Sequence, residues 1–507
     1  MHGSFLFEET ASEASTSESM QDMSSNSYDA TAGAQAASTP ETGATFDELV
    51  DRLLSQPTSK VDTKFIAIFL ALYRKFAAPG RLLEAIVERF DMLDRNGTPQ
   101  MLVTVNQLRY LSVLEQWLSR YPGDFAFPKT KRRMRTFVGK LSQNPVFGAA
   151  GKEMVAHLDA ANDDDDTNWA YSDRDRASRG DDQRSSMSSR ASTLIDDPTF
   201  NFEDFNLSGS TIFEDLAPPG GDTNKSISGA STTSSQIVAN VEAAQRQAEK
   251  LQPRPRMVLT KVQWRMLMDV PDEVLAKELT RIDWIMFSSI RPRDLIRQVS
   301  LNESERAGCK NLNHVNRMSA HFNHLADWVA NYVLLRDKPK HRAFMLEKFM
   351  RVARRLRELN NYNALGAIIA GVKSTAIHRL GATRDLLSQD IGKDWMKLEI
   401  LMAPSKSHFA YRLAWENSSS ERIPYLPLLR RDLVSAEGGN RTFIGDEKDG
   451  RINWKKFEIK GEVLVTMQKA QGMPYRNLMS QRPHDGVREL VLDVKLCSDE
   501  DVSLPNS

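Results

Sequence analysis

Large apolar side chains recur at helical spacing in two blocks of this 507-residue chain, and this pattern constrains the fold most strongly. In the first block, residues 46–158, Phe65, Phe69 and Tyr73 follow one another at intervals of four. Side chains four apart lie on the same face of an α-helix, where they can be buried together. The second block, residues 256–480, repeats the pattern over a longer stretch. The sequence therefore predicts an all-α protein with two helical domains.

The segments outside these blocks have a different composition. Residues 1–45 are rich in Ser, Thr, Ala and Glu, and residues 159–255 are dominated by Ser, Arg, Gly and Asp. Chains with few large apolar side chains cannot bury enough surface to offset the entropy lost on ordering. We therefore predict a disordered N-terminal tail, a long disordered linker between the domains, and a C-terminal tail over residues 481–507.

The predicted linker contains two features of interest. Residues 199–216, TFNFEDFNLSGSTIFEDL, combine acidic and aromatic side chains, which is compatible with a solvated tract or with a docking or autoinhibitory segment. Ser178 and Ser192 each follow an arginine by two positions, so they are candidate phosphorylation sites in an accessible segment. Such short matches are also common by chance.

The charge balance and the cysteines exclude several classes of protein. Lys plus Arg and Asp plus Glu both total 67, which weighs against a dedicated nucleic-acid binder. The two cysteines, Cys309 and Cys497, indicate neither a disulfide framework nor a metal site. The longest apolar run, residues 364–372, is too short to span a bilayer. We expect a cytoplasmic protein without a secretory signal, which a partner would recruit if it works at the plasma membrane.

Motifs for covalent chemistry are missing from the sequence. It contains no Walker-type phosphate loop, no HExxH, no CxxC and no GxSxG. His314, His321 and His324 lie close together, but no cysteine or paired carboxylate completes a metal site. A polar surface or capping role is therefore the expectation for these histidines. We expect no metal, no cofactor and no covalent catalysis, and a protein that acts by binding another macromolecule.

A series of motifs in the second block resembles the catalytic domain of Ras-family guanine-nucleotide exchange factors. The most diagnostic are RELNNYN at residues 357–363 and STAIHRL at residues 374–380. The remaining motifs follow the family's order, at residues 275–280, 290–295, 316–334, 423–426, 437–440, 452–454 and 474–475. In the first block, FLALYRKF at residues 69–76 and Pro79 are similar to the signature of the Ras exchanger motif domain. The resemblance covers both predicted domains and neither the linker nor the tails.

The resemblance implies an exchange factor for a small GTPase of the Ras or Rap type. In the family, a helical hairpin opens the nucleotide site of the GTPase, which releases GDP and allows GTP to bind. The hairpin corresponds to residues 424–474 here, and the first domain is expected to brace it. The alternative is a GTPase-binding scaffold with weak or no exchange activity, and a plain helical adaptor is the third class.

The resemblance also assigns residues to the GTPase-binding surface and the hairpin. Tyr425 matches an aromatic residue that lines a pocket for the second switch of the GTPase, although a tyrosine ring suits internal packing equally well. Val434 matches an apolar residue placed over the magnesium site. The full set is Leu279, Thr280, Asn360, Lys373, Tyr425, Leu429, Arg431, Val434, Glu437 and Gly438.

Three positions depart from the family's pattern. Gly438 stands where many members have a second glutamate, Lys373 where many have asparagine, and His408 where an aromatic residue is usual. Either Glu437 substitutes for the missing carboxylate, or exchange relies on steric opening alone. These departures bear on catalytic strength and on the choice of GTPase more than on the fold.

The asparagines of the diagnostic motif have a structural role that follows from their chemistry. Asn360, Asn361 and Asn363 would be unfavourable inside a helix, because their amides compete for backbone hydrogen bonds. We predict that they cap and brace a polar corner between two core helices. Ser374 and Thr375 are predicted to begin the following helix.

Overall fold

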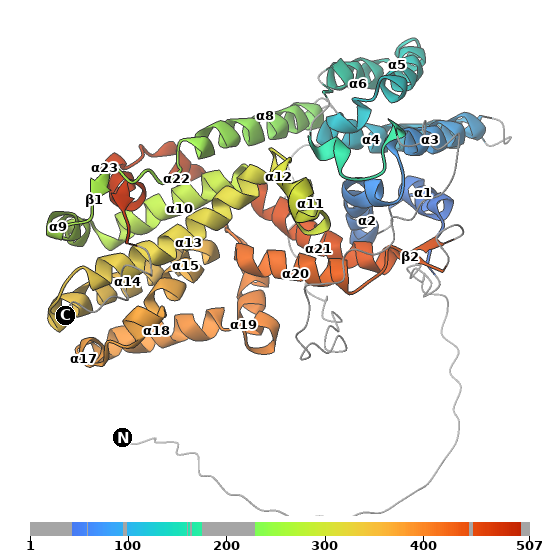
Figure 1. The fold of residues 1–507 in the computed structure, drawn as a ribbon. Coiled ribbons are helices and arrows are strands. Elements are labelled where there is room, and N and C mark those ends of the chain that lie inside the picture. Colours follow the sequence, from blue (N-terminus) through green and yellow to red (C-terminus); the bar gives the residue numbers. More distant parts are fainter. Residues whose placement is uncertain are drawn as a thin grey trace, which may run out of the picture. The chain divides into compact units, whose positions relative to one another are not determined.

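The computed structural model describes residues 43–57, 59–94, 99–159, 161–162, 165–174, 229–445 and 450–497. Its elements are nearly all helices, and the described part contains only two sheets of two short strands each, which confirms the all-α prediction (Figure 1). The predicted N-terminal tail up to residue 42, Ser178, Ser192 and residues 199–216 lie outside the described residues.

The first helical region begins with two capped helices. Thr45 and Ser59 each form a capping box, with Glu48 and Asp62 respectively, so both helix starts are satisfied locally. Phe69, Tyr73 and Trp117 are fully buried in its core. The elements are α1 (Phe46–Leu54), α2 (Lys60–Leu72), η1 (Tyr73–Lys75), α3 (Pro79–Leu93), α4 (Gln100–Arg120), η2 (Pro122–Phe125), α5 (Pro128–Ser142), α6 (Gly148–Asp159) and η3 (Asp165–Asn168).

The second helical region is built around four long helices that contact one another, α10, α13, α14 and α15. Trp328, Tyr332 and Phe349 are fully buried between them. The elements before the hairpin are α8 (Gly229–Glu249), β1 (Met257–Val258), α9 (Lys261–Asp269), α10 (Asp272–Ser288), α11 (Pro292–Ser300), α12 (Glu303–Ala307), α13 (Leu312–Leu334), α14 (Pro339–Glu358), α15 (Tyr362–Val372), α16 (Thr375–His378), α17 (Gly381–Arg384), α18 (Gln389–Met402) and α19 (Ser405–Glu416).

Packed structure also occurs within residues 159–255 and 481–507, which composition assigns to the linker and to the C-terminal tail. Trp169 is buried in the first helical region, and helix α8 packs along α10. Two further elements, α22 (Arg476–Ser480) and α23 (Asp485–Leu492), follow the hairpin, and β4 (Val494–Lys495) pairs in parallel with β1. These segments contain few apolar residues overall, so their composition predicted disorder. A few apolar side chains nevertheless anchor them to the fold.

The predicted hairpin consists of α20 (Leu426–Gly438), two short antiparallel strands, β2 (Phe443–Ile444) and β3 (Arg451–Ile452), and α21 (Trp454–Gln471). Pro427 lies in the first turn of α20, where its missing N–H removes no helix hydrogen bond. Asn453 precedes α21, but its side chain donates to the carbonyl of Arg441 at 3.1 Å and does not cap the helix. Asp449, which with Gly450 forms a sequence pair that favours a turn, lies outside the described residues.

Helix α21 of the hairpin packs against α2 of the first helical region. The ring of Trp454 lies 4.7 Å from that of Phe65, and the ring of Phe457 lies 5.1 Å from that of Phe76. At the strand end of the hairpin, Ala44 exchanges two backbone hydrogen bonds with Ile452, at 2.9 and 2.7 Å. The hairpin is therefore held by the first helical region along its second helix and at its strands.

Gly461 allows the close approach of α21 to α2. A Cβ atom at this position would lie 2.4 Å from a side-chain carbon of Ile68, well inside van der Waals contact. We predict that Gly461→Ala lowers the free energy of unfolding by about 1–3 kcal/mol, because overpacking forces the two helices apart. Gly139→Ala is the matched control, since a Cβ there would meet nothing within 4 Å. Chemical denaturation that shows both variants equally stable would contradict this prediction.

Candidate functional site

The polar corner that supports the hairpin is formed by the three predicted asparagines. Asn361 accepts a hydrogen bond from the Ala364 N–H at 3.0 Å and caps α15, which confirms its predicted role. Asn360 adopts a left-handed conformation with φ of 52°, and its amide donates to the Ser420 hydroxyl at 2.8 Å. Backbone hydrogen bonds also join this corner to Ile423, immediately before the hairpin. The diagnostic motif thus fixes where α20 begins.

Helix α20 presents one buried face and one open face. Leu429, like Leu426 and Leu433, is buried against the rest of the fold. On the opposite face, Arg431, Val434 and Gly438 follow at helical spacing, and the Val434 side chain is 47% exposed. We refer to Arg431, Val434 and Gly438 as the open face of α20. A single exposed valine is common on protein surfaces, so Val434 becomes a contact candidate only through its match to the family's hairpin residue.

Helices α18 and α19, which pack against each other, carry further exposed apolar side chains. Met396 and Ile400 on α18 are each 61% exposed, and Phe409 on α19 is 59% exposed. Arg412 of α19 makes two hydrogen bonds to the carboxylate of Asp432 on α20, at 2.9 and 2.8 Å, so these helices are joined side by side. Exposed apolar side chains therefore occur on α18 and α19 as well as on the open face of α20.

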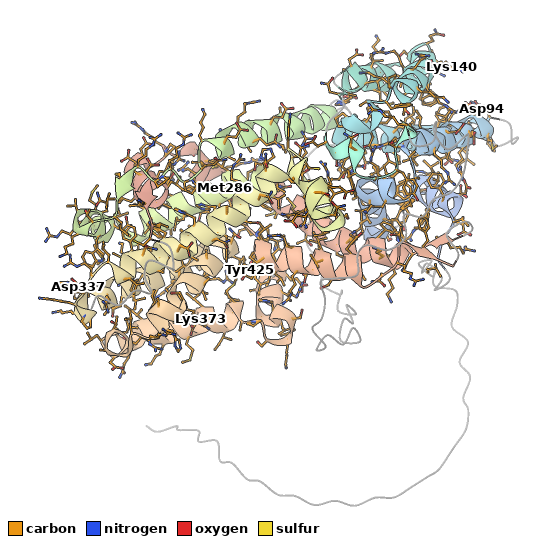
Figure 2. All side chains as sticks on the ribbon, in the orientation of Figure 1. Asp94, Lys140, Met286, Asp337, Lys373 and Tyr425 are labelled. Atoms are coloured by element: carbon orange, nitrogen blue, oxygen red, sulfur yellow. The ribbon has the colours of Figure 1, made fainter. Side chains whose placement is uncertain are left out.

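Tyr425 lies at the start of α20, between the core and the surface (Figure 2). Its half-buried ring lies 6.0 Å from the ring of Phe322 and 5.9 Å from the ring of His408. A Cβ at residue 366 would lie 2.6 Å from the Tyr425 ring, so only glycine fits beneath it. The tyrosine ring therefore packs against internal residues, and part of it stays accessible. Both predicted roles, internal packing and contact with the GTPase, are compatible with this position.

His408, one of the three departures, occupies an unusual turn at the start of α19. Lys406, Ser407 and His408 all have positive φ, of 46°, 54° and 60°, which is unfavourable for residues with a side chain. The turn is held by Arg412, whose Nε donates to the carbonyl of Ser407 at 2.9 Å. Burial and the nearby Arg431 and Arg412 lower the pKa of His408, which favours the neutral ring. The imidazole thus packs against Tyr425 where the family has an aromatic ring.

Lys373, the second departure, is exposed at the C-terminal end of α15 (Figure 2). Its ammonium lies 3.6 Å from the carboxylate of Glu399 on α18. An exposed ion pair of this kind contributes little stability, so Lys373 remains accessible to a partner.

The carboxylate of Glu437, the candidate substitute for the missing glutamate, points at buried lysines of α21. The carboxylate accepts a hydrogen bond from the fully buried Lys460 and lies 3.8 Å from Lys456, both on α21. It also lies 3.7 Å from Lys75 of the first helical region. Burial lowers the pKa of Lys75 and of Lys456 to about 8. Glu437 thus joins the two hairpin helices to the first region, and Gly438 supplies no side chain in its place.

Two other predicted contact residues are internal. Leu279 and Thr280 are both 0% exposed in α10, and the Thr280 hydroxyl accepts a hydrogen bond from Asn361 at 3.3 Å. They cannot touch a partner in this conformation, so their contribution is to support the asparagine corner. Sequence motifs alone do not separate such supporting residues from contact residues.

Arg293 is a functional candidate that the sequence did not single out. It belongs to α11, is 2% exposed, and reaches into the first helical region. Its guanidinium donates to Asp124 at 2.8 and 3.1 Å and to Asp166 at 2.9 Å. It also donates to the carbonyls of Leu70 and Ala71 at 2.8 and 3.0 Å. The only sequence signal was an arginine inside an otherwise structural motif, residues 290–295.

The histidine cluster has a different environment from the one predicted. His321 is 1% exposed and therefore does not lie on the surface, and burial lowers its pKa to about 3. Its Nε2 lies 3.6 Å from the buried carboxylate of Asp283. Among the described residues, no three His, Cys, Asp or Glu side chains are grouped to hold a metal ion.

The buried Asp283 predicts a pH dependence of stability. Burial raises its pKa from 3.8 to about 7, and hydrogen bonds from Asn361 and Asn363 oppose this only in part. The folded state therefore favours the protonated acid, so this stabilisation is complete below pH 3.8 and is lost as the pH rises to about 7. We expect wild type to lose about 2 kcal/mol relative to Asp283→Asn between pH 5.5 and 8.5.

Urea denaturation of both proteins at several pH values measures this difference. Asp390→Asn is the control, because the Asp390 side chain is 95% exposed and its replacement should give a difference independent of pH. A constant difference between wild type and Asp283→Asn across the range would show that Asp283 is ionised throughout.

No helix in the described part of the chain is long and apolar enough to cross a bilayer.

Comparison with known proteins identifies both helical regions. Residues 42–138 match the RasGEF N-terminal motif and residues 274–458 match the RasGEF domain. The chain is 24% identical over 455 residues to Ras guanine nucleotide exchange factor A of Dictyostelium discoideum, covering 89% of this chain and 61% of that protein. It is 32% identical over 232 residues to human Rap guanine nucleotide exchange factor 3, covering 45% of this chain and 24% of that protein.

The chain thus spans less than two thirds of the length of these relatives, 61% of one and 24% of the other. The matched residues include the asparagine corner, α20 with its open face, and the part of the first helical region that packs on α21. With both domains present in the family's order, this chain belongs to the family of Ras-type guanine-nucleotide exchange factors.

Proposed function

We propose that this protein is a guanine-nucleotide exchange factor for a small GTPase of the Ras or Rap type. The observation that carries the proposal is the match of both domains, together with a hairpin whose open face bears an exposed Val434. The relatives named above are exchange factors for Ras in one case and for Rap in the other, which supports the class of partner and leaves both types in view.

In the proposed mechanism, α20 inserts beside the nucleotide of the GTPase. Val434 brings an apolar side chain toward the magnesium and phosphate site, and an apolar group offers no ligand oxygen to the ion. In this mechanism exchange is driven by binding energy alone, without a covalent step. A factor that binds the nucleotide-free GTPase more tightly than the loaded one must, by linkage, weaken nucleotide binding by the same ratio.

The rigidity of the hairpin is part of this proposal. A GTPase that holds its nucleotide at picomolar affinity binds it with roughly 16 kcal/mol. A hairpin that opens such a site must resist being displaced itself. Packing of α21 on α2, the Ala44–Ile452 pairing and the lysine cluster around Glu437 all oppose its displacement. The first helical region therefore acts as a brace for the hairpin.

The second candidate is a scaffold that binds the GTPase without releasing nucleotide. The engagement of Glu437 by Lys75, Lys456 and Lys460 favours it, because no carboxylate on the open face then competes with the phosphates. Binding of the full chain to nucleotide-free and to GDP-loaded GTPase separates the candidates. We expect at least a hundredfold preference for the nucleotide-free form, about 3 kcal/mol. Equal affinity for both forms would rule out exchange by this protein.

A further inference from the structure

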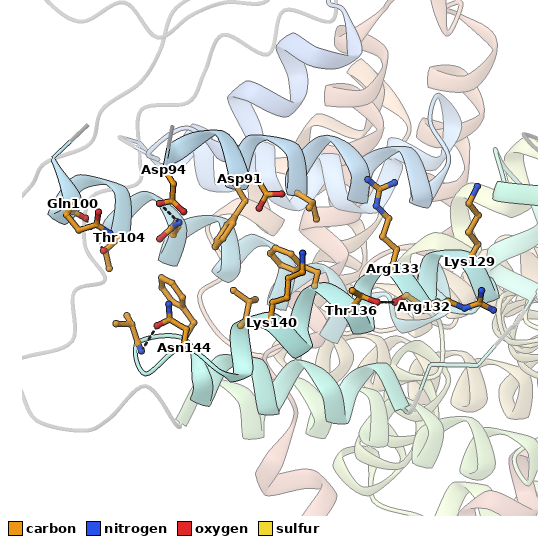
Figure 3. Close-up of a pocket in the computed structure, with 17 residues that line it drawn as sticks. Asp91, Asp94, Gln100, Thr104, Lys129, Arg132, Arg133, Thr136, Lys140 and Asn144 are labelled. Carbon is orange, nitrogen blue, oxygen red and sulfur yellow. Dashed lines mark hydrogen bonds between the residues drawn. The ribbon is translucent and has the colours of Figure 1, made fainter. Parts of the chain in front are cut away.

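A hollow of about 670 Å³ lies in the first helical region, between α3, α4 and α5, far in sequence from the hairpin (Figure 3). Its floor is aromatic: the Phe90 ring lies 5.2 Å from that of Phe137 and 6.3 Å from that of Phe147. Its walls combine these rings with polar residues of α4, including Gln100 and Thr104. We call this hollow the α3–α5 groove.

The two ends of the groove carry opposite charge. Lys129, Arg132 and Arg133 lie at one end and Asp94 at the other, with Lys140 and Asp91 between them (Figure 3). Arg133 is paired with Glu84 at 2.9 Å. Lys129, Arg132 and Lys140 are exposed, and none of them has an ion-pair partner among the residues that the structure describes. We call these three the basic rim.

The groove has no role in the proposed exchange mechanism. The hairpin packs on α2 and forms an ion pair with Lys75 of η1, whereas the groove is formed by α3, α4, α5 and the turn that follows α5. An aromatic floor beside unpaired cations matches a ligand that has aromatic rings and negative charge together.

The chain itself contains such a segment. Residues 199–216 carry four phenylalanines and four acidic residues and no lysine or arginine. The acidic residues occur in two Phe-Glu-Asp triplets, at residues 202–204 and 213–215. Each triplet places one ring directly beside two carboxylates, the combination that the floor and the basic rim would receive. We propose that residues 199–216 dock in the α3–α5 groove of the same chain.

The position of the neighbouring chain supports an intramolecular contact. Asp173 accepts hydrogen bonds from the Gly80 N–H at 3.0 Å and from the Thr130 hydroxyl, so the chain is fixed beside Lys129, at the basic end of the groove. Residues 175–198 can span roughly 80 Å, whereas α5 is only about 22 Å long. The chain is next described in α8, which contacts α4. The segment is therefore tethered from both sides within reach of the groove, at a high effective concentration.

The test uses the full chain with the groove left vacant. Replacing Phe200, Phe202, Phe205 and Phe213 by alanine removes the rings of the segment without touching the described fold. A fluorescein-labelled peptide of residues 199–216 is then titrated with this variant and followed by fluorescence anisotropy. We expect saturable binding to the variant and at least tenfold weaker binding to wild type, whose own segment competes for the groove.

Charge reversal of the basic rim locates the binding site. Lys129→Glu, Arg132→Glu and Lys140→Glu together should abolish peptide binding to the vacant-groove variant. A peptide in which lysine replaces Glu203, Asp204, Glu214 and Asp215 should bind the variant whose basic rim is reversed. The matched control reverses Lys152, Lys261 and Lys495, which are exposed and lie outside the groove. That control should bind the original peptide as the vacant-groove variant does.

Three results would overturn the proposal. They are no binding of the peptide to the vacant-groove variant, equal binding to wild type and to that variant, and binding that survives reversal of the basic rim. Binding to vesicles containing phosphatidylserine that depends on the basic rim, without any peptide binding, would assign the groove to an anionic membrane instead. None of these results depends on exchange activity, so the proposal stands or falls separately from the proposed function.

Discussion

Replacing Arg293 by methionine is expected to lower the free energy of unfolding by about 3–5 kcal/mol, the usual cost of leaving one half of a buried ion pair. Arg293 is buried and satisfies Asp124, Asp166 and the carbonyls of Leu70 and Ala71 at once. Its guanidinium also lies 3.9 Å from the centre of the Tyr121 ring. Methionine fills part of the volume of the arginine side chain but donates no hydrogen bond. The hydrogen bonds that are lost are those to groups of the first helical region.

The charge state of Asp124 explains the size of this effect. Burial alone would raise its pKa, but Arg293 and Arg74 lower the pKa to about 2. A depressed carboxyl pKa contributes stability above about pH 4 that is lost as the pH falls toward 2. Without Arg293, only Arg74, at 3.1 Å, still pairs with Asp124. The destabilisation should therefore be largest at neutral pH, where the carboxylate is charged.

Two further variants and one further measurement sharpen the Arg293 experiment. Arg354→Met is the matched control, because Arg354 is 61% exposed and its ion pairs are solvated, so a change within about 0.5 kcal/mol is expected. Arg293→Met combined with Asp124→Asn should lose less than the sum of the single variants, because the unpaired charge is gone. Arg293→Met should also slow nucleotide exchange by loosening the brace on the hairpin. Denaturation curves in which Arg293→Met matches Arg354→Met would exclude the anchoring role.

Replacing Val434 by aspartate is expected to reduce kcat/KM for nucleotide release by about tenfold to a hundredfold while leaving the fold intact. In the proposed complex the valine is buried, so aspartate loses about 1.5–3 kcal/mol of apolar burial and brings a charge toward phosphates of the same sign. In the free protein Val434 is 47% exposed, so the substitution leaves the core and the brace unchanged.

The control for Val434→Asp is Val262→Asp in α9, where the valine is 61% exposed and lies outside the hairpin. Both variants are compared with wild type by thermal unfolding and by release of a fluorescent GDP analogue. Equal exchange rates for Val434→Asp and Val262→Asp would remove α20 from the mechanism, whatever the rates themselves are.

Much of the fold follows from local features of the sequence. The spacing of Phe65, Phe69 and Tyr73 fixes the buried face of the second helix, and Asn361 caps α15 as its chemistry predicts. Helix α20 spans Leu426–Gly438, with Pro427 in its first turn and the glycine pair at 438 and 439 at its end, where both residue types act within one turn. Local rules are sufficient wherever the determining contact lies a few residues away.

The contacts that the sequence did not reveal join residues far apart. Arg293 meets Asp124 across 169 positions, and Glu437 meets Lys75 from the other helical region. Helical periodicity carries no information about such pairs, since a charged residue at a core position looks like an ordinary surface charge. The same limitation explains why Leu279 and Thr280 were assigned to the contact surface although both are buried.

Release of a fluorescent GDP analogue from a panel of Ras and Rap GTPases, with the full chain added at a fraction of the GTPase concentration, tests the central claim most directly. We predict that each molecule of this protein turns over many GTPases of at least one type. We also predict that Val434→Asp loses this acceleration and that Val262→Asp keeps it. Release that remains at the intrinsic rate for every GTPase in the panel would contradict the account, even if the protein binds one of them tightly.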